Sequence, residues 1–147
     1  MKHFILILAL FASFAYGLDK AIIDETKAKI GEYGVACIDS EKPTPEDVSA
    51  LMKHSAPPTR AGRCVLFCVS KKLGLMTEDG QLADIPQSEI IEKIKADDAE
   101  VYNKLSQLHD LCKDRVEKSK DGCDASLELF SCTKYEAQKL DIDKLFF

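Results

Sequence analysis

The sequence predicts an all-α domain of about six helices that is cross-linked by disulfides. Beyond residue 17, apolar residues recur at spacings of three and four, which is the period of an amphipathic helix, and no stretch shows the alternation of a strand. Hydroxyl and acidic residues stand where these periodic segments begin, as helix caps do. The six cysteines form an even set, which is typical of disulfide-linked secreted domains. The length of 147 residues fits a single domain.

The N-terminus has the pattern of a secretory signal peptide. A short basic start precedes an apolar run from Phe4 to Phe14, and Ala15 and Gly17 supply small residues at positions −3 and −1 of a cleavage site. The run is too short to cross a bilayer, which needs ~20 apolar residues. We therefore expect a signal peptide over residues 1–17 and a single exported domain over residues 18–147, without membrane insertion. The alternative is a buried N-terminal helix.

The first two helices are predicted by an apolar stripe and by a start signal. The first runs from Asp19 to about Cys37, and its stripe consists of Ile23, Thr26, Ile30 and Tyr33. The second begins at Thr44, whose hydroxyl can cap it, followed by Pro45 and two acids that suit the positive end of a helix. Its expected buried face consists of Val48, Leu51 and Met52.

The third helix is predicted to lie at the centre of the fold. Thr59 stands at its start and Gly74 at its end. The segment from Cys64 to Val69 is apolar all round, so we expect other helices to surround it.

Three more helices follow a turn at Asp79-Gly80. Pro86 and Ser88 open a short helix, Asp97 and Asp98 open a longer one, and Gly122 separates the longer helix from the last. The residues expected to be apolar contacts of these three helices are, in order, Ile90, Ile91 and Ile94; Val101, Leu105, Leu108 and Cys112; and Leu127, Phe130 and Tyr135.

The cysteines carry geometric information but do not reveal their pairing. Cys64 and Cys68 lie one helical turn apart on the same face, so each can reach a different neighbour. Cys123 and Cys132 lie on opposite sides of the last helix. Six cysteines allow 15 pairings, and the spacings do not choose among them. Structural zinc is the alternative to disulfides, but the one close cysteine pair lacks the second pair that such a site needs.

Composition and motifs disfavour several function classes. The formal charge of −5 and the absence of a basic run exclude nucleic acid as an expected partner. His109-Asp110 resembles the catalytic helix of secreted phospholipases, but the cysteine pair before the histidine and a Gly-rich calcium loop are missing. The segment from Glu117 to Glu128 imitates an EF-hand loop, but it starts with Glu and contains Cys123. We expect no enzyme activity, no catalytic residue, no metal and no cofactor.

The cysteine spacing resembles the six-cysteine signature of the insect odorant-binding proteins, which include the pheromone-binding and general odorant-binding proteins. The pattern is Cys37-x26-Cys64-x3-Cys68-x43-Cys112-x10-Cys123-x8-Cys132, and the x3 and x8 gaps are its most specific parts. The resemblance implies the disulfides Cys37–Cys68, Cys64–Cys123 and Cys112–Cys132. It also implies a secreted carrier that binds small apolar molecules in an internal cavity, with a membrane chemoreceptor as a further candidate partner and a monomer or weak homodimer as the oligomeric state.

A physical argument also favours a hollow core. A domain of this size usually folds without disulfides. An empty cavity of ~300 Å³ would cost about 7 kcal/mol, which three disulfides at ~2–4 kcal/mol each can offset. Two alternatives remain open. One is a helical protein that acts through its surface, as a cytokine or an antimicrobial protein does, and the other is a carrier of the same family outside olfaction.

We expect the ligand to be bound by apolar side chains of several helices and of the C-terminal tail. The expected wall consists of Met52, Val69, Leu73, Leu75, Met76, Ile94, Leu108, Leu127, Phe130, Phe146 and Phe147. For each of them, plain core packing is the alternative. An exposed end as apolar as Leu145 to Phe147 would be adhesive, so we expect it to fold back as a lid, anchored by Asp141 and Asp143. The alternative is a frayed terminus.

Overall fold

The computed structural model describes residues 17–84, 88–119 and 121–147. These residues form six α-helices and a short 3-10 helix: α2 (Lys20–Glu41), α3 (Pro45–Met52), α4 (Arg60–Lys72), α5 (Glu89–Asp97), α6 (Ala99–Glu117), α7 (Gly122–Lys139) and η2 (Asp143–Leu145). Extended pairing within these ranges is limited to one isolated bridge between Met76 and Leu82. The predicted all-α class is therefore confirmed. All but the last residue of the predicted signal peptide lies outside the described residues.

Each α-helix begins at a side-chain cap. Asp19, Thr44, Thr59, Ser88, Asp98 and Asp121 all accept a hydrogen bond from a backbone N–H of the first turn that follows. Thr44 forms a full capping box with Asp47. Two boundaries differ from expectation: α2 continues to Glu41, past the predicted end near Cys37, and Gly122 is the first residue of α7, with Asp121 as its cap. Pro86, the other predicted start residue of α5, lies outside the described residues.

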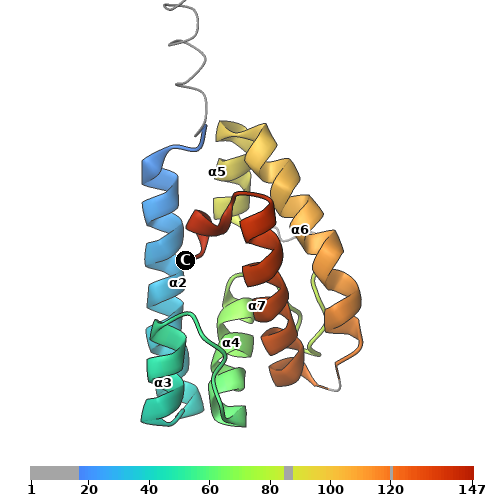
Figure 1. Cartoon of the computed structure of the whole chain (residues 1–147). Helices are drawn as coiled ribbons and strands as arrows, with labels where there is room; N and C mark the ends of the chain where they lie inside the picture. The colour runs from blue at the N-terminus through green and yellow to red at the C-terminus, as the bar shows by residue number, and fades with distance from the viewer. Residues whose placement is uncertain (1–16, 85–87, 120) are drawn as a thin grey trace, which may run out of the picture.

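The helices pack around α4 and α7, which lie side by side. On its other flank α7 packs against α6, whereas α4 packs against α2 and α3 (Figure 1). Helix α5 contacts both α6 and α2. The all-apolar centre of α4 is thus covered by three neighbouring helices, as predicted. No helix in the described part of the chain is long and apolar enough to cross a membrane.

Three disulfides join the helices in pairs. Cys37–Cys68 links α2 to α4, Cys64–Cys123 links α4 to α7, and Cys112–Cys132 links α6 to α7. This is the pairing that the resemblance implied. The loops that they close span 31, 59 and 20 residues. Each such bridge typically adds ~2–4 kcal/mol by restricting the unfolded chain.

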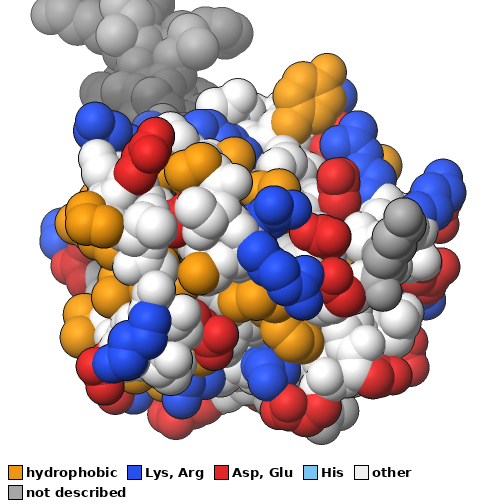
Figure 2. Space-filling model, turned by 90° about the horizontal axis from the view of Figure 1, so that it is seen from below, with side chains coloured by type: hydrophobic (Ala, Val, Ile, Leu, Met, Phe, Trp, Pro, Cys, Tyr) orange, Lys and Arg blue, Asp and Glu red, His pale blue; other side chains and the backbone are white. Residues whose placement is uncertain are grey.

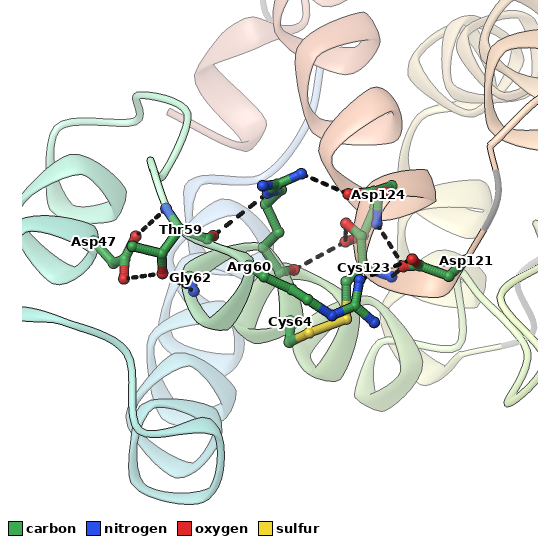
Figure 3. A network of polar contacts seen from close by, with 10 residues as sticks. Asp47, Thr59, Arg60, Gly62, Cys64, Asp121, Cys123 and Asp124 are labelled. Carbon is green, nitrogen blue, oxygen red and sulfur yellow. Dashed lines mark hydrogen bonds and ion pairs between the residues drawn. A yellow bond between two sulfur atoms is a disulfide. The ribbon is translucent and has the colours of Figure 1, made fainter.

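Polar contacts hold the N-terminal ends of α4 and α7 together beside the Cys64–Cys123 disulfide (Figure 3). Arg60 pairs with Asp121 at 2.8 Å and Arg63 with Asp124 at 2.6 Å. These pairs are partly exposed, so each contributes little net stability, and their main effect is to fix how the two helices lie against each other.

The buried side chains form two clusters. One surrounds the Cys112–Cys132 disulfide and includes Leu108, Ala137, Ile142 and Leu145. The other consists of Met76, Leu82, Val116 and Ala125. The expected buried face of α3 is partly wrong, because the Met52 side chain is 74% exposed and the fully buried residue of this helix is Asp47. Tyr135, expected to pack inward from α7, is also exposed.

The outer surface carries charges of both signs. Seen from below, Lys and Arg side chains lie among Asp and Glu side chains, with small separate groups of apolar side chains between them (Figure 2). Such an interspersed surface suits a protein with a modest net charge of −5.

Candidate ligand cavity

A cavity of about 810 Å³ lies between the helices. Its size falls in the range of small-molecule sites, which is roughly 300–1,000 Å³. Four helices, α2, α4, α6 and α7, form most of the wall, and Ile91 of α5, the end of α3, the segment between α4 and α5, and the C-terminal tail complete it. Most of the lining side chains are apolar. The arrangement can therefore hold an apolar molecule away from water.

The helices α2, α4 and α7 each present one face to the cavity. The wall residues follow the helical spacing, namely Lys27, Ile30, Gly31, Gly34, Val35 and Ile38 of α2; Val65, Leu66, Val69 and Ser70 of α4, with Leu73 at its C-cap; and Ser126, Leu129, Phe130 and Thr133 of α7. The polar members of these faces are few. Burial of apolar surface would dominate binding, and a small number of hydrogen bonds would set orientation.

Helix α6 contributes the most polar part of the wall. Tyr102, Ser106 and His109 lie at positions i, i+4 and i+7 of one face and all three line the cavity. His109 Nε2 lies 2.7 Å from the carbonyl oxygen of Ala83, which can only accept, so Nε2 carries the proton. The Ser106 hydroxyl donates to the Tyr102 carbonyl at 3.2 Å. This face offers hydroxyl groups to a ligand that carries one polar group.

The mouth of the cavity lies beside α2 and the end of α3. Val35 and Met52, which both line the cavity, are 71% and 74% exposed. Lys27 and Gly31 are wall residues on the same exposed side of α2. Because these wall residues are exposed, the cavity opens to the surface at this place.

The C-terminal tail folds back across the cavity and ends beside α2 (Figure 1). Leu145 is 5% exposed, and Phe146 and Phe147 line the cavity. The Phe147 ring packs edge-on against His54 and Phe130, at centroid distances of 5.3 and 6.0 Å.

Hydrogen bonds hold the last residues of the tail. Lys27 Nζ donates to the Phe147 carbonyl oxygen at 3.2 Å, and the backbone N–H groups of Phe146 and Phe147 donate to the Asp143 carbonyl oxygen. We expected the carboxylates of Asp141 and Asp143 to anchor the tail. That anchoring stays a prediction, whereas Lys27, the aromatic contacts and buried Leu145 are contacts that the structure shows.

Eight of the predicted wall residues line the cavity. They are Met52, Val69, Leu73, Leu75, Leu108, Phe130, Phe146 and Phe147. Their contact with a ligand remains a prediction.

Three predicted wall residues do not line the cavity. Met76 pairs with Leu82 in the β-bridge, which directs it into the cluster with Val116 and Ala125. Ile94 is only 2% exposed and lies where α5 packs against its neighbours. Leu127 is one residue, or about 100°, away from the face of α7 that begins at Ser126.

Sequence reasoning missed the inner face of α2 and the polar face of α6. The predicted stripe of α2 included Ile30, but Ile23 and Thr26 belong to the packed part of the helix, not to the cavity wall. A second stripe with helical spacing, which begins at Lys27 and includes two glycines, was present in the sequence. This stripe was not recognised, because glycine is not counted as an apolar residue when a helical stripe is sought.

The two sequence motifs that resembled an enzyme site and a calcium loop lie at His109-Asp110 and in the segment from Glu117 to Glu128. Asp110 Oδ1 lies 3.4 Å from His109 Nδ1, and the Asp110 side chain is 83% exposed. Within the segment from Glu117 to Glu128, Cys123 is bonded to Cys64. The residues searched, which are the described ones, contain no group of three His, Cys, Asp or Glu side chains that could hold a metal ion.

Residues 19–136 match the model of the PBP/GOBP family. The chain is similar to general odorant-binding protein 19d of Drosophila melanogaster, with 33% identity over 96 residues, 65% of this chain and 63% of the relative, so less than two thirds of that relative is spanned. It is also similar to general odorant-binding protein 28a of the same organism, with 25% identity over 78% of this chain and 80% of the relative.

Two solved structures share the fold. One is the odorant-binding protein dmelOBP28a from Drosophila melanogaster, with a TM-score of 0.65 and 24% identity. The other is a pheromone binding protein from the cockroach Leucophaea maderae in complex with the fluorescent reporter ANS (1-anilinonaphthalene-8-sulfonic acid), with a TM-score of 0.55 and 18% identity. Each comparison covers 82% of this chain and 98% of the other chain. The likeness shows that the helical arrangement is common to the three proteins.

Proposed function

The chain belongs to the PBP/GOBP family, and from that premise we propose that it is a secreted carrier that binds small hydrophobic molecules, of the odorant or pheromone type, in the cavity between its helices. The observation that carries the proposal is the cavity of about 810 Å³ with its mainly apolar wall. Removing apolar ligand surface from water contributes roughly 25 cal/mol per Å². Binding would therefore depend on how much of the ligand the wall encloses.

The polar face of α6 would orient the ligand. An alcohol placed against this face can donate to Ser106 Oγ, and an alcohol, ester or aldehyde can accept from the Tyr102 hydroxyl, while the hydrocarbon part contacts α2, α4 and α7. One or two such bonds add selectivity to an interaction that apolar burial dominates.

The carrier would act outside the cell. The signal-peptide pattern over residues 1–17 supports export, and the three disulfides suit an oxidising compartment. A monomer or weak homodimer that delivers its ligand to a membrane chemoreceptor is the working arrangement that we propose. Carriage of another lipophilic molecule outside olfaction uses the same cavity, and the tissue of expression distinguishes the two roles.

A binding titration tests the proposal. We expect purified mature protein to bind 1-anilinonaphthalene-8-sulfonic acid saturably, with a rise in fluorescence that volatile alcohols, esters and aldehydes reverse. A protein that acts only through its surface, such as a cytokine or an antimicrobial protein, needs no cavity and would show no saturable displacement. That outcome would contradict the carrier function.

Two alanine variants separate cavity wall from packed core. Leu73 lines the cavity, whereas Ile94 is 2% exposed and lies outside the wall. We expect Leu73→Ala to weaken probe binding about tenfold, because it removes apolar contact with the ligand. Ile94→Ala should lower the free energy of unfolding by about 2–5 kcal/mol and leave probe affinity nearly unchanged. Fluorescence titration and urea unfolding of both variants provide the measurement. If Leu73→Ala lowers stability and spares affinity, Leu73 is core.

A further inference from the structure

Two glycines lie in the middle of α2, where helices normally avoid them. Gly31 and Gly34 are interior residues of the 22-residue helix Lys20–Glu41. Each glycine destabilises a helix by roughly 0.5–1 kcal/mol relative to alanine, because it leaves the unfolded chain more freedom. Some local requirement must account for both.

Neither an unusual backbone conformation nor close packing explains why glycine stands at these two positions. The glycines with a left-handed backbone are Gly74 and Gly80, not Gly31 and Gly34. Apart from its two chain neighbours and the adjacent backbone of α2 itself, a Cβ atom added at Gly31 or at Gly34 would meet no atom of the described chain within 4 Å.

Other glycines of this chain are needed for close packing. A Cβ at Gly62 would collide with Asp47 and Pro57, and a Cβ at Gly122 would collide with the Phe67 ring. Gly31 and Gly34 differ because the space beside them is open and belongs to the cavity, whose wall includes both.

The two residues create a recess in the cavity wall. They stand three positions apart on the face of α2 that lines the cavity, and their neighbours on that face, Ile30, Val35 and Ile38, carry full side chains. Gly31 is exposed and Gly34 is half-buried, so the recess extends from the mouth inward. Along this stretch the ligand would meet bare helix backbone.

We propose that Gly31 and Gly34 determine ligand specificity, and that the recess they form accepts the ring or branched part of an apolar ligand. The proposal rests on the carrier function proposed above and concerns the same cavity. A thin linear chain needs no such recess, because it fits between side chains. A ring or a branch is thicker and gains contact only where α2 lacks side chains, and the packing of such groups is sensitive to single methyl groups.

Alcohols of equal carbon number test the proposal. Menthol is cyclic and 1-decanol is linear, and both have ten carbons and one hydroxyl group. Calorimetric titration would measure their dissociation constants for wild-type protein, for Gly34→Leu and for the double variant Gly31→Ala/Gly34→Ala. We expect Gly34→Leu to weaken menthol binding at least about tenfold and 1-decanol binding less than about threefold. The double variant should show the same preference with a smaller change.

Thermal unfolding gives a second measurement, in which the double alanine variant should gain stability although it loses menthol affinity. The double alanine variant should melt about 4 °C higher than wild type, since both alanines favour the helix and fit the open space. The matched control is Ala36→Gly, at an exposed position of α2 outside the wall. It should lower the melting temperature and leave both alcohol affinities unchanged.

Several outcomes would overturn the inference. Equal losses for both alcohols or unchanged menthol affinity would mean that the recess does not select ligand shape. A lower melting temperature of the double alanine variant would mean that the space beside the two glycines is not open, which removes the recess itself. Slower association and release with unchanged affinity would show that the glycines serve helix bending instead. If wild-type protein binds neither alcohol nor the fluorescent probe, the carrier function itself fails, which is a distinct result.

Discussion

Replacing Asp47 with asparagine is expected to lower the free energy of unfolding at pH 7 by about 3 kcal/mol. The Asp47 side chain is completely buried and accepts four hydrogen bonds, from the backbone N–H and hydroxyl of Thr44 and from the same two groups of Thr59, at 2.6–2.9 Å. Asparagine keeps the shape but replaces one acceptor oxygen with an NH₂ group, which would face donors. Because Thr44 caps α3 and Thr59 caps α4, the substitution disturbs both helix starts. Figure 3 shows the contacts between Asp47 and Thr59.

The same carboxylate predicts a loss of stability in acid. Burial alone would raise the pKa of Asp47, but the hydrogen bonds from Thr59 and Thr44 outweigh burial and lower the pKa from its ordinary value of 3.8 to about 2. A folded-state pKa below the unfolded value stabilises the fold above the unfolded value. This contribution of about 2 kcal/mol is therefore complete above about pH 4 and is lost as the pH falls toward 2.

Urea unfolding of wild type and Asp47→Asn at pH 7, 4 and 2 measures both effects. The stability difference between the two proteins should narrow by about 2 kcal/mol from pH 4 to pH 2. The matched control is Glu46→Gln, which changes an exposed acid in the same helical turn and should cost no more than about 1 kcal/mol. A difference that stays constant with pH would show that the Asp47 carboxylate is not held in its charged form.

The sequence was sufficient where structure is decided locally. Helix starts depend on a capping side chain and the few residues that follow it, so Thr44, Thr59 and Ser88 could be read directly. Helical periodicity gave the helices to within a few residues at their ends. The disulfide pairing is not local, and it came from the resemblance in cysteine spacing.

The cavity wall was only partly predictable, because a residue beside a cavity and a residue in a packed core are both apolar. Leu73 and Ile94 look alike in the sequence, and only tertiary packing separates them. Asp47 appeared as one of two acids at a helix start, and its bonds to Thr59, 12 residues away, could not be inferred. Gly31 and Gly34 could not be recognised as wall residues from the sequence, because they affect the cavity only through the absence of a side chain.

Removing Leu145, Phe146 and Phe147 is expected to weaken probe binding and to speed probe release by about tenfold, because affinity changes in related complexes reside mostly in the dissociation rate. The tail crosses the cavity, with Phe146 and Phe147 in its wall. The deletion also removes the contact between Phe147 and Lys27 and the ring contacts with His54 and Phe130. The six described α-helices lie outside the deleted segment, which removes only the last residue of η2, so the helical circular-dichroism signal should persist.

Leu145 complicates this deletion, since it is 5% exposed and belongs to the cluster around Cys112–Cys132. The variant Phe146→Ala/Phe147→Ala keeps Leu145 and removes only the two rings that line the cavity. Stopped-flow displacement of 1-anilinonaphthalene-8-sulfonic acid should show faster release from both variants than from wild type. Leu111→Ala, which removes an exposed apolar side chain of α6 outside the wall, should release the probe at the wild-type rate. If both tail variants also release the probe at that rate with unchanged affinity, the tail does not act as a lid.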